Sequence, residues 1–248
     1  MQSTEGQPRS APLSPYISLN SVRSAEVVVP IVLEYVRARS VVDFGCKHGE
    51  WLSVFRAHGV NRIMGFDRPK RLERGLMIDA AEFAVADLAQ PVTIDARFDL
   101  AVCIEVAEHL PQTSAASLVR SLTAAAPAVL FSAAIPGQGG HGHLNEQPRQ
   151  YWIDLFQQEG FTSFDCLRPR IWKNGQVAWW YRQNLFMFCS PTAVLESPLL
   201  DRESIGSEAK DLDLVHVDIL NRSRFGAARS AMRGLVAPFL KRRRASAI

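Results

Sequence analysis

Residues 41–52 are the most constraining segment of this 248-residue chain, because they combine a strand, a tight turn and the start of a helix. A β-branched run ends in an acid, Asp43, two glycines follow at Gly45 and Gly49, and an amphipathic stretch begins after them. Glycines let a backbone approach a ligand closely, and free N–H groups at a helix start favour polar or anionic atoms. This order of elements predicts an α/β fold with a ligand at the turn.

A second predicted strand, 62–66, leads into another acid, Asp67, which lies 18 residues beyond Gly49. At about this spacing a carboxylate can accept hydrogen bonds from the two hydroxyls of a ribose. Asp87 and Glu105 each follow a further predicted strand. Because the carboxyl ends of parallel strands meet at one edge of a sheet, these acids predict one site for an adenosine-containing ligand.

Strand patterns alternate with helical patterns along the chain. The predicted strands cover 41–45, 62–66, 83–86, 100–104, 128–135, 162–166 and 184–189. Helices are predicted from a cap at Ser24 through residue 37, over 49–58, 115–125 and 150–159, and from a start near Glu108 or Pro111. This alternation predicts a Rossmann-like, doubly wound, mainly parallel seven-stranded sheet. Because the last two strands lack a clear helix between them, an antiparallel edge strand is expected.

Composition divides the chain into three parts. We expect a flexible segment at 1–20, a ligand-binding α/β domain at 21–191, and an extension at 192–248 that is first acidic and then basic. The last 30 residues hold eight Lys or Arg and no acid. Because the whole chain has a net charge of +3, the rest of it carries a net charge of −5. Helical spacing of the tail's apolar residues leaves three interpretations open: a docked helix, peripheral contact with an anionic membrane, and nucleic-acid contact.

Cysteine usage indicates a cytoplasmic protein, with membrane association through the basic tail as an open alternative. The four cysteines are far apart and form no Cys-x-x-Cys pair, which predicts reduced thiols: Cys46, Cys103, Cys166 and Cys189. No run reaches the ~18–20 apolar residues of a membrane span. The first twenty residues lack the charged start and apolar core of a signal peptide.

With these residues in view, the chain resembles the class I S-adenosylmethionine-dependent methyltransferases over roughly residues 22–190. The segment 41–49 is similar to the family's acid and glycine-rich turn, and 98–110 to its fourth-strand motif. Asp67 matches the acid that holds the ribose hydroxyls, and Asp87 the acid at the adenine. The resemblance implies S-adenosylmethionine as cofactor. The residues expected to bind it are Asp43, Gly45, Gly49, Asp67, Asp87, Leu88 and Glu105.

One residue departs from the family's pattern. Lys47 stands where the acid-x-Gly-x-Gly-x-Gly turn of the family has its middle glycine. A lysine there either points to solvent or crowds the methionine part of the cofactor. If it prevents cofactor binding, the chain would be a scaffold that keeps the fold without turnover.

Methyl transfer to a hydroxyl needs an aligned acceptor and a base that removes its proton, and histidine is the usual base near neutral pH. His109 follows the fourth strand, and His143 lies in a polar, glycine-rich loop at 137–149 after the fifth. We slightly prefer His143 as base or acceptor contact, because the neighbouring Asn145 and Glu146 can orient it. His109 comes next, and Glu108 beside it completes the predicted catalytic set.

These residues predict O-methylation of a hydroxyl on a small molecule, sugar or glycan. One alternative is a metal-assisted RNA 3′-end 2′-O-methyltransferase, since a further set resembles that family's two Glu and two His ligands: Glu105, Glu108, His109 and His143. The Glu-x-x-Glu-His fragment also resembles many small-molecule methyltransferases that use no metal, so we predict no metal. The net charge of −5 outside the basic tail disfavours a nucleic-acid partner unless the tail binds it. Another alternative is a nucleotide-binding oxidoreductase, which the Gly-x-x-x-Gly turn disfavours because the full Gly-x-Gly-x-x-Gly signature is lacking.

Overall fold

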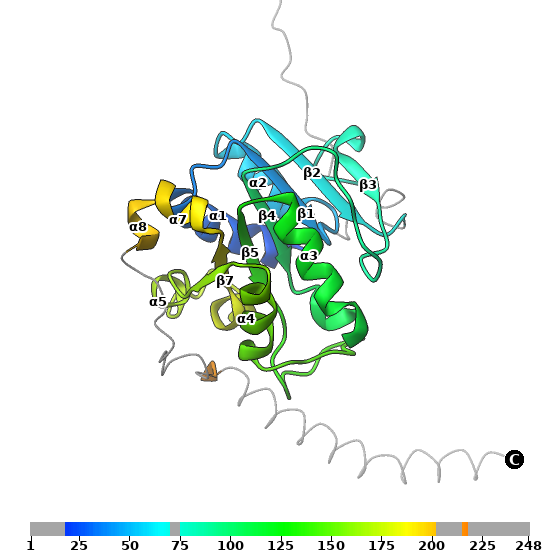
Figure 1. Ribbon diagram of the computed structural model, residues 1–248, viewed down its shortest axis with the longest axis vertical. Helices are drawn as coiled ribbons and strands as arrows, with labels where there is room; N and C mark the ends of the chain where they lie inside the picture. Colours follow the sequence, from blue (N-terminus) through cyan, green and yellow to red (C-terminus); the bar gives the residue numbers. More distant parts are fainter. Residues whose placement is uncertain (1–17, 70–74, 202–214, 218–248) are drawn as a thin grey trace, which may run out of the picture.

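Seven strands form one sheet in the order β3-β2-β1-β4-β5-β7-β6 in the computed structural model, which describes residues 18–69, 75–201 and 215–217 (Figure 1). The strands are β1 (Ser40–Phe44), β2 (Arg62–Asp67), β3 (Phe83–Val85), β4 (Leu100–Ile104), β5 (Ala128–Ser132), β6 (Thr162–Phe164) and β7 (Phe186–Cys189). β7 is reversed relative to the other strands and pairs antiparallel with both of its neighbours, β5 and β6. The predicted Rossmann-like sheet with an antiparallel edge is confirmed, with β7 second from that edge and β6 outermost.

Helices cover both faces of the sheet (Figure 1). The longer ones are α1 (Leu19–Tyr35), α2 (Glu50–Ala57), α3 (Ala115–Ala125) and α4 (Arg149–Gln158). Shorter ones are α5 (Arg168–Ile171), α6 (Trp179–Asn184), α7 (Pro191–Glu196), α8 (Pro198–Asp201) and the 3-10 turns Ala80–Glu82, Ala107–His109 and Gln112–Ser114. Because successive strand side chains point to opposite faces, Val41 packs into the core under α1 and α2, and Val42 into the core under α3 and α4.

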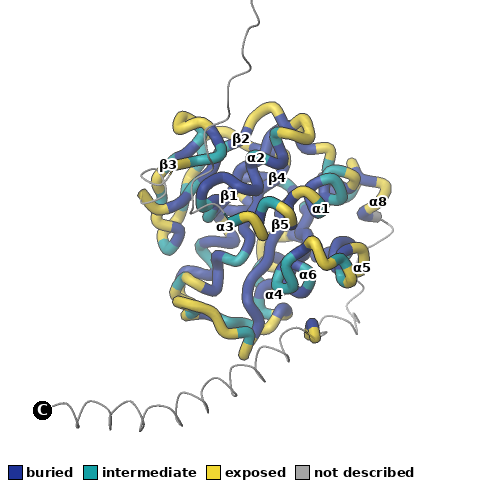
Figure 2. Tube along the Cα trace, turned by 180° about the vertical axis from the view of Figure 1, so that it is seen from behind, coloured by how far each residue is buried: buried dark blue, intermediate teal, exposed yellow. Residues whose placement is uncertain are grey.

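The central strands are buried on both faces. Every residue of β1, β4 and β5 is buried, and these strands form the dark centre of Figure 2. Parallel strands covered by helices on both sides read as continuous apolar runs, which explains why the sequence revealed them clearly. On one face, the Phe156 ring of α4 stacks on the Phe188 ring of β7 with centroids 3.8 Å apart.

The strand order reverses between β1 and β4, and this reversal positions the functional site. β2 and β3 lie to one side of β1, while β5 lies beyond β4 on the other, so the turns after β1 and β4 diverge and leave a crevice. Gly45, directly after β1, has a φ of +93°, and a Cβ added there would lie 2.3 Å from a methyl of Val106, just after β4. The two turns approach so closely that no side chain fits at residue 45.

Several predicted element boundaries were wrong. The first helix begins at Leu19 with Ser18 as its cap, because the Ser18 hydroxyl accepts a hydrogen bond from the Ser21 N–H. Ser24, the predicted cap, lies inside the helix and satisfies its hydroxyl on the Asn20 carbonyl at 2.6 Å. At the other end of the domain, residue 184 closes α6 instead of opening the last strand, and β5 ends three residues earlier than predicted, at Ser132.

Part of the predicted extension packs against the domain. Ala193 of α7 and Leu200 of α8 are buried in the core under α1, and His216 is buried against Trp172. The basic tail at 219–248 and most of the predicted flexible segment 1–20 lie outside the described residues. Within the described part, no helix is long and apolar enough to cross a membrane. All four cysteines are buried free thiols, as predicted.

We expect the Phe156→Ala substitution to lower the free energy of unfolding by about 3–5 kcal/mol, because it leaves a cavity between α4 and β7 that the stacked Phe188 ring cannot fill. Urea unfolding followed by circular dichroism measures the change. Leu195→Ala on α7 is the control, since this side chain is 87% exposed and its loss should change stability by less than about 0.5 kcal/mol. Equal effects of the two substitutions would contradict the packing described here.

Candidate active site

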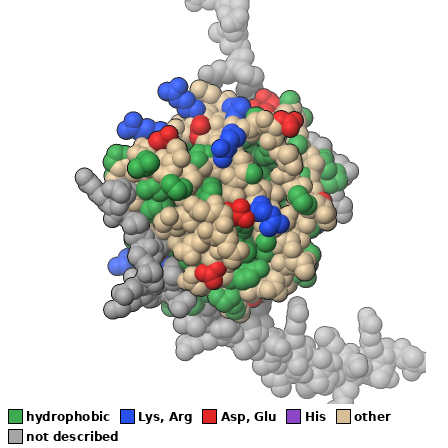
Figure 3. Space-filling view, in the orientation of Figure 1, with side chains coloured by type: hydrophobic (Ala, Val, Ile, Leu, Met, Phe, Trp, Pro, Cys, Tyr) green, Lys and Arg blue, Asp and Glu red, His purple; other side chains and the backbone are tan. Residues whose placement is uncertain are grey.

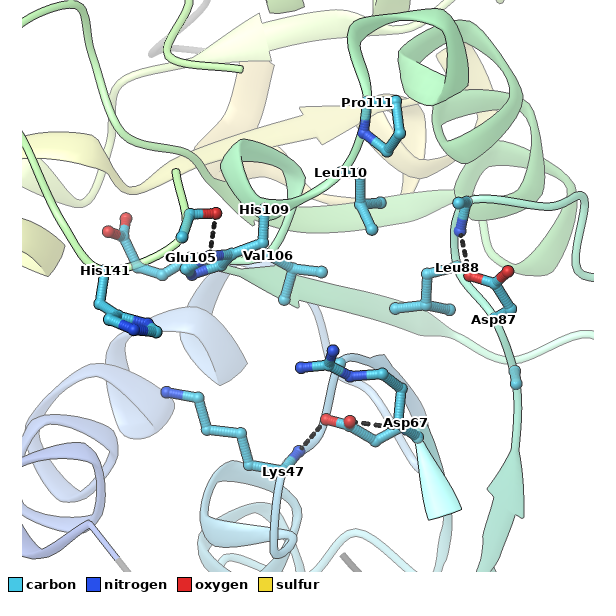
Figure 4. Close-up of a pocket in the computed structure, with 15 residues that line it drawn as sticks. Lys47, Asp67, Asp87, Leu88, Glu105, Val106, His109, Leu110, Pro111 and His141 are labelled. Atoms are coloured by element: carbon cyan, nitrogen blue, oxygen red, sulfur yellow. Dashed lines mark hydrogen bonds between the residues drawn. The ribbon is translucent and has the colours of Figure 1, made fainter. Parts of the chain in front are cut away.

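A cavity of about 590 Å³ opens at the carboxyl ends of the central strands, beside the reversal between β1 and β4. Its walls come from the turns that follow β1, β2, β3 and β4 and from the loop after β5 (Figure 4). The cavity brings together five of the seven residues predicted to bind a cofactor: Gly45, Asp67, Asp87, Leu88 and Glu105. Residues distant in sequence therefore meet where the strand-end argument placed them.

The other two predicted residues, Asp43 and Gly49, lie beside the cavity instead of lining it. Asp43 is 3% exposed and borders a narrow hollow under the turn, which it shares with Gly45 and Lys47. Burial, followed by the nearby charge of Asp67, raises the pKa of Asp43 well above its usual value. Gly49 is the N-cap of α2 with a φ of +83°, and a Cβ there would lie 2.9 Å from the side chain of Ile78. These residues shape the turn.

The carboxylate of Asp67 clamps this turn to the end of β2. One oxygen accepts the Lys47 N–H at 2.8 Å, and the other accepts the Arg68 N–H at 2.6 Å. Each carboxylate oxygen can accept more than one hydrogen bond, so a carboxylate that holds a loop can also bind hydroxyl groups of a ligand. The same side chain can thus position the loop and meet a ligand.

Glu105 is held at the end of β4 by three neutral donors. Its oxygens accept hydrogen bonds from the Ser132 hydroxyl at 2.9 Å and the amides of Asn184 at 3.1 Å and Gln138 at 3.3 Å. Burial raises its pKa, and these hydrogen bonds oppose that shift. Sequence reasoning missed all three partners. Gln138 and Asn184 stand in polar stretches of loop and helix, but only the fold brings them to one carboxylate.

Glu146 organises the loop after β5. Its carboxylate accepts the backbone N–H groups of Gly137 and Gly139, both at 2.8 Å, and lies 2.7 Å from Nδ1 of His143. The expectation that Glu146 can orient His143 agrees with this geometry. The His143 ring in turn meets the His109 ring edge to face, with centroids 4.9 Å apart.

The two candidate bases differ in their position relative to the cavity. His109 lines the cavity, whereas His143 lies behind it among the loop residues. Nδ1 of His109 lies 3.2 Å from the Gly142 carbonyl (Figure 4). A neutral ring that donates there carries its lone pair on Nε2. Burial is the largest influence that lowers the pKa of His109, which favours this neutral, basic form.

Glu108, the third predicted catalytic residue, is fully buried, and its carboxyl oxygens find no donor among the described residues. Burial, and then the neighbouring Glu105 charge, raises the pKa of Glu108 to about 9. Three residues each offer one possible ligand atom: Glu108, His109 and His143. These three atoms lie within 4.8 Å of one another, so the group can hold a metal ion. Glu105 is not part of this group.

The two ends of the cavity differ in chemistry. Asp67 and Asp87 offer carboxylates at one end, and the apolar side chains of Leu88 and Val106 lie between them and His109 (Figure 4). Carboxylates for ribose hydroxyls and an exocyclic amine, with apolar walls for a flat ring, are the groups that an adenosine requires. Because Gly45 has no side chain and lies close to Val106, its backbone is exposed directly to the cavity. The residues present therefore fit an adenosine-containing cofactor.

Comparisons with known proteins agree with this geometry. Residues 25–165 match the model of a family described as a methyltransferase domain. A search of curated proteins found no match. Among solved structures, the sugar N-methyltransferase KedS8 from a Streptoalloteichus species superposes with a TM-score of 0.54 and 16% identity, over 77% of this chain and 98% of that one. The methyltransferase domain of the bacterial CtHen1 has a TM-score of 0.50 and 18% identity, over 68% of this chain and 98% of that one. At these identities the likeness concerns the fold.

We expect Asp67→Ala to weaken the binding of S-adenosylhomocysteine by about 10- to 100-fold, because it removes a charged hydrogen-bond acceptor for the ribose and also releases the turn amides of Lys47 and Arg68. Isothermal titration calorimetry measures the change. Asp95→Ala, at an exposed bend away from the cavity, is the control and should bind like the unaltered chain. Unchanged affinity in the Asp67 variant would remove this placement of the nucleoside.

Proposed function

Because the chain belongs to the methyltransferase-domain family and is a class I S-adenosylmethionine-dependent methyltransferase, we propose that it methylates a hydroxyl group on a small molecule or sugar. The observation that carries this proposal is the position of His109, whose Nε2 has no hydrogen-bond partner among the described residues and whose ring lines the cavity. A neutral imidazole in that place can take the proton of an acceptor hydroxyl.

The donor would lie across the carboxyl ends of the strands. Asp67 would accept the ribose hydroxyls, Asp87 would accept the exocyclic amine, and Leu88 with Val106 would flank the ring. When bound, S-adenosylmethionine supplies a methyl group on a positively charged sulfur that leaves readily. Most of the remaining task for the protein is alignment and proton removal.

His109 would perform the proton removal. The acceptor hydroxyl would give its proton to Nε2 of His109, and the hydrogen bond from Nδ1 to the Gly142 carbonyl would stabilise the charged ring that results. Glu146 holds His143 and the backbone of the same loop, so it keeps the wall behind His109 in place. His143 then acts as a positioning residue, while His109 touches the acceptor.

The shape and charge of the molecule support a small acceptor. A cavity of about 590 Å³ lies within the usual range for small-molecule sites. On the face seen in Figure 3, Lys and Arg side chains are scattered among Asp and Glu side chains. A sugar acceptor is also in keeping with KedS8, a fold neighbour that is described as a sugar N-methyltransferase.

A second candidate is metal-assisted methylation at an RNA 3′ end, favoured by the grouping of Glu108, His109 and His143. One feature makes it the weaker proposal. Glu105, the fourth member of the resembling set, lies outside this group and already accepts hydrogen bonds from Ser132, Asn184 and Gln138. The family match also favours methyl transfer over the oxidoreductase alternative.

We expect His109→Ala to lower kcat by about 10²- to 10⁴-fold while S-adenosylhomocysteine affinity changes less than about 3-fold, because the ring acts on the acceptor and not on the donor. A labelled-methyl assay over hydroxylated metabolites and sugars gives the rates, and calorimetry gives the affinity. His143→Ala should cost less rate than His109→Ala. His58→Ala, exposed at the end of α2, is the control. A larger loss in the His143 variant would return the base role to His143.

The two candidate functions differ in their response to chelation. We expect turnover on the small acceptor to survive dialysis against a chelator, because no step assigned to His109 needs a metal. The RNA candidate requires the opposite: loss of activity on chelation and recovery with Mg²⁺ or Mn²⁺. Calorimetric titration with Mn²⁺ of the unaltered chain and of the Glu108→Gln variant serves as the matched binding test, and stoichiometric binding lost in the variant would favour the second candidate.

A further inference from the structure

Lys47 is a cavity residue that the proposed function leaves unexplained. Its side chain does not turn to solvent: it is half-buried, lines the cavity and extends toward the side where Glu105 and His141 lie (Figure 4). Its ammonium makes no hydrogen bond or ion pair with any residue of the described ranges. A partly desolvated cation without a counterion is unfavourable unless a ligand supplies the anion.

The backbone at Lys47 indicates that its side chain, not its conformation, is what the position requires. Residue 47 has a φ of +53°, a left-handed conformation that glycine adopts without strain and lysine adopts at an energetic cost. The Asp67 carboxylate fixes this geometry by accepting the Lys47 N–H. A glycine would form the same turn with less strain. Strained residues of this kind concentrate at ligand-binding sites.

The acids around the cavity do not use the Lys47 ammonium as a partner. Asp67 accepts backbone amides, Asp87 accepts the Ala89 N–H, and Glu105 accepts three neutral donors. Although burial raises the pKa of Glu105, the Lys47 charge acts in the opposite direction, so the two groups lie close enough to influence each other. One positive and one negative group therefore face the same side of the cavity (Figure 4).

We propose that Lys47 binds the carboxylate of the amino-acid end of the methyl donor, so that an ion pair replaces the close backbone contact that a glycine would give. The donor's amino-acid end carries a carboxylate and an ammonium, which match Lys47 and Glu105 in sign. Its nucleoside end would lie at Asp67, which accepts a hydrogen bond from the Lys47 N–H. Both ends of the donor would therefore lie next to Lys47. This inference rests on the proposed function, because it concerns the donor of that reaction.

Two ligands that differ only in the amino-acid end test the proposal by calorimetry. S-adenosylhomocysteine has this end, and 5′-methylthioadenosine lacks it while keeping the nucleoside and the sulfur. We expect Lys47→Asn to weaken the binding of S-adenosylhomocysteine by about 10- to 100-fold and the binding of 5′-methylthioadenosine by less than about 2-fold. Asparagine tolerates the left-handed conformation, so this variant should keep the turn. Lys47→Arg should retain most of the affinity.

Lys173→Asn is the matched control, because Lys173 lies in a turn after α5 outside the cavity and should leave both affinities unchanged. If Lys47→Asn weakens both ligands equally, Lys47 acts only on the shape of the turn, and the proposal is wrong. If it weakens neither, the ammonium serves an anionic acceptor or solvent, and the proposal is also wrong. Failure of both ligands to bind the unaltered chain would instead overturn the proposed function, and this inference with it.

Discussion

The contact between Gly45 and Val106 is the constraint on which the rest of the structure depends. It joins the turn after β1 to the turn after β4 at the place where the strand order reverses, and an added Cβ would lie 2.3 Å from the valine methyl. Because the backbone is bare there, the two turns can approach each other and still leave a crevice above them. The Asp67 carboxylate then holds the same turn from its other side.

The two ends of the cavity differ in chemistry. Carboxylates and apolar side chains line one end, whereas histidines and a lysine line the other, where the proposed function would place the methyl acceptor. A buried amide network holds that second end: Gln138 accepts hydrogen bonds from Asn184 and Gln183, and both Gln138 and Asn184 donate to Glu105. The loop after β5 and helix α6 therefore act through one carboxylate.

Much of the fold could be predicted because its signals are local. Buried parallel strands read as apolar runs, and turns read as glycine and acid, so all seven strands and the helices α2, α3 and α4 were found close to their places. The predicted start of the first helix was too late, because Ser24 resembles an N-cap residue. A serine hydroxyl inside a helix can instead donate a hydrogen bond to the carbonyl one turn earlier, as Ser24 does. Periodicity cannot distinguish these two uses of the same residue type.

The sequence by itself determined that strand-end acids and glycines would converge on one edge of a parallel sheet, since this follows from chain direction and crossover handedness. Only the tertiary structure decided which side chains reach the cavity. It placed His109 in the wall and His143 behind it, and it directed Lys47 inward. These outcomes depend on contacts between residues far apart in the chain, such as Glu105 with Asn184, and no local pattern encodes them.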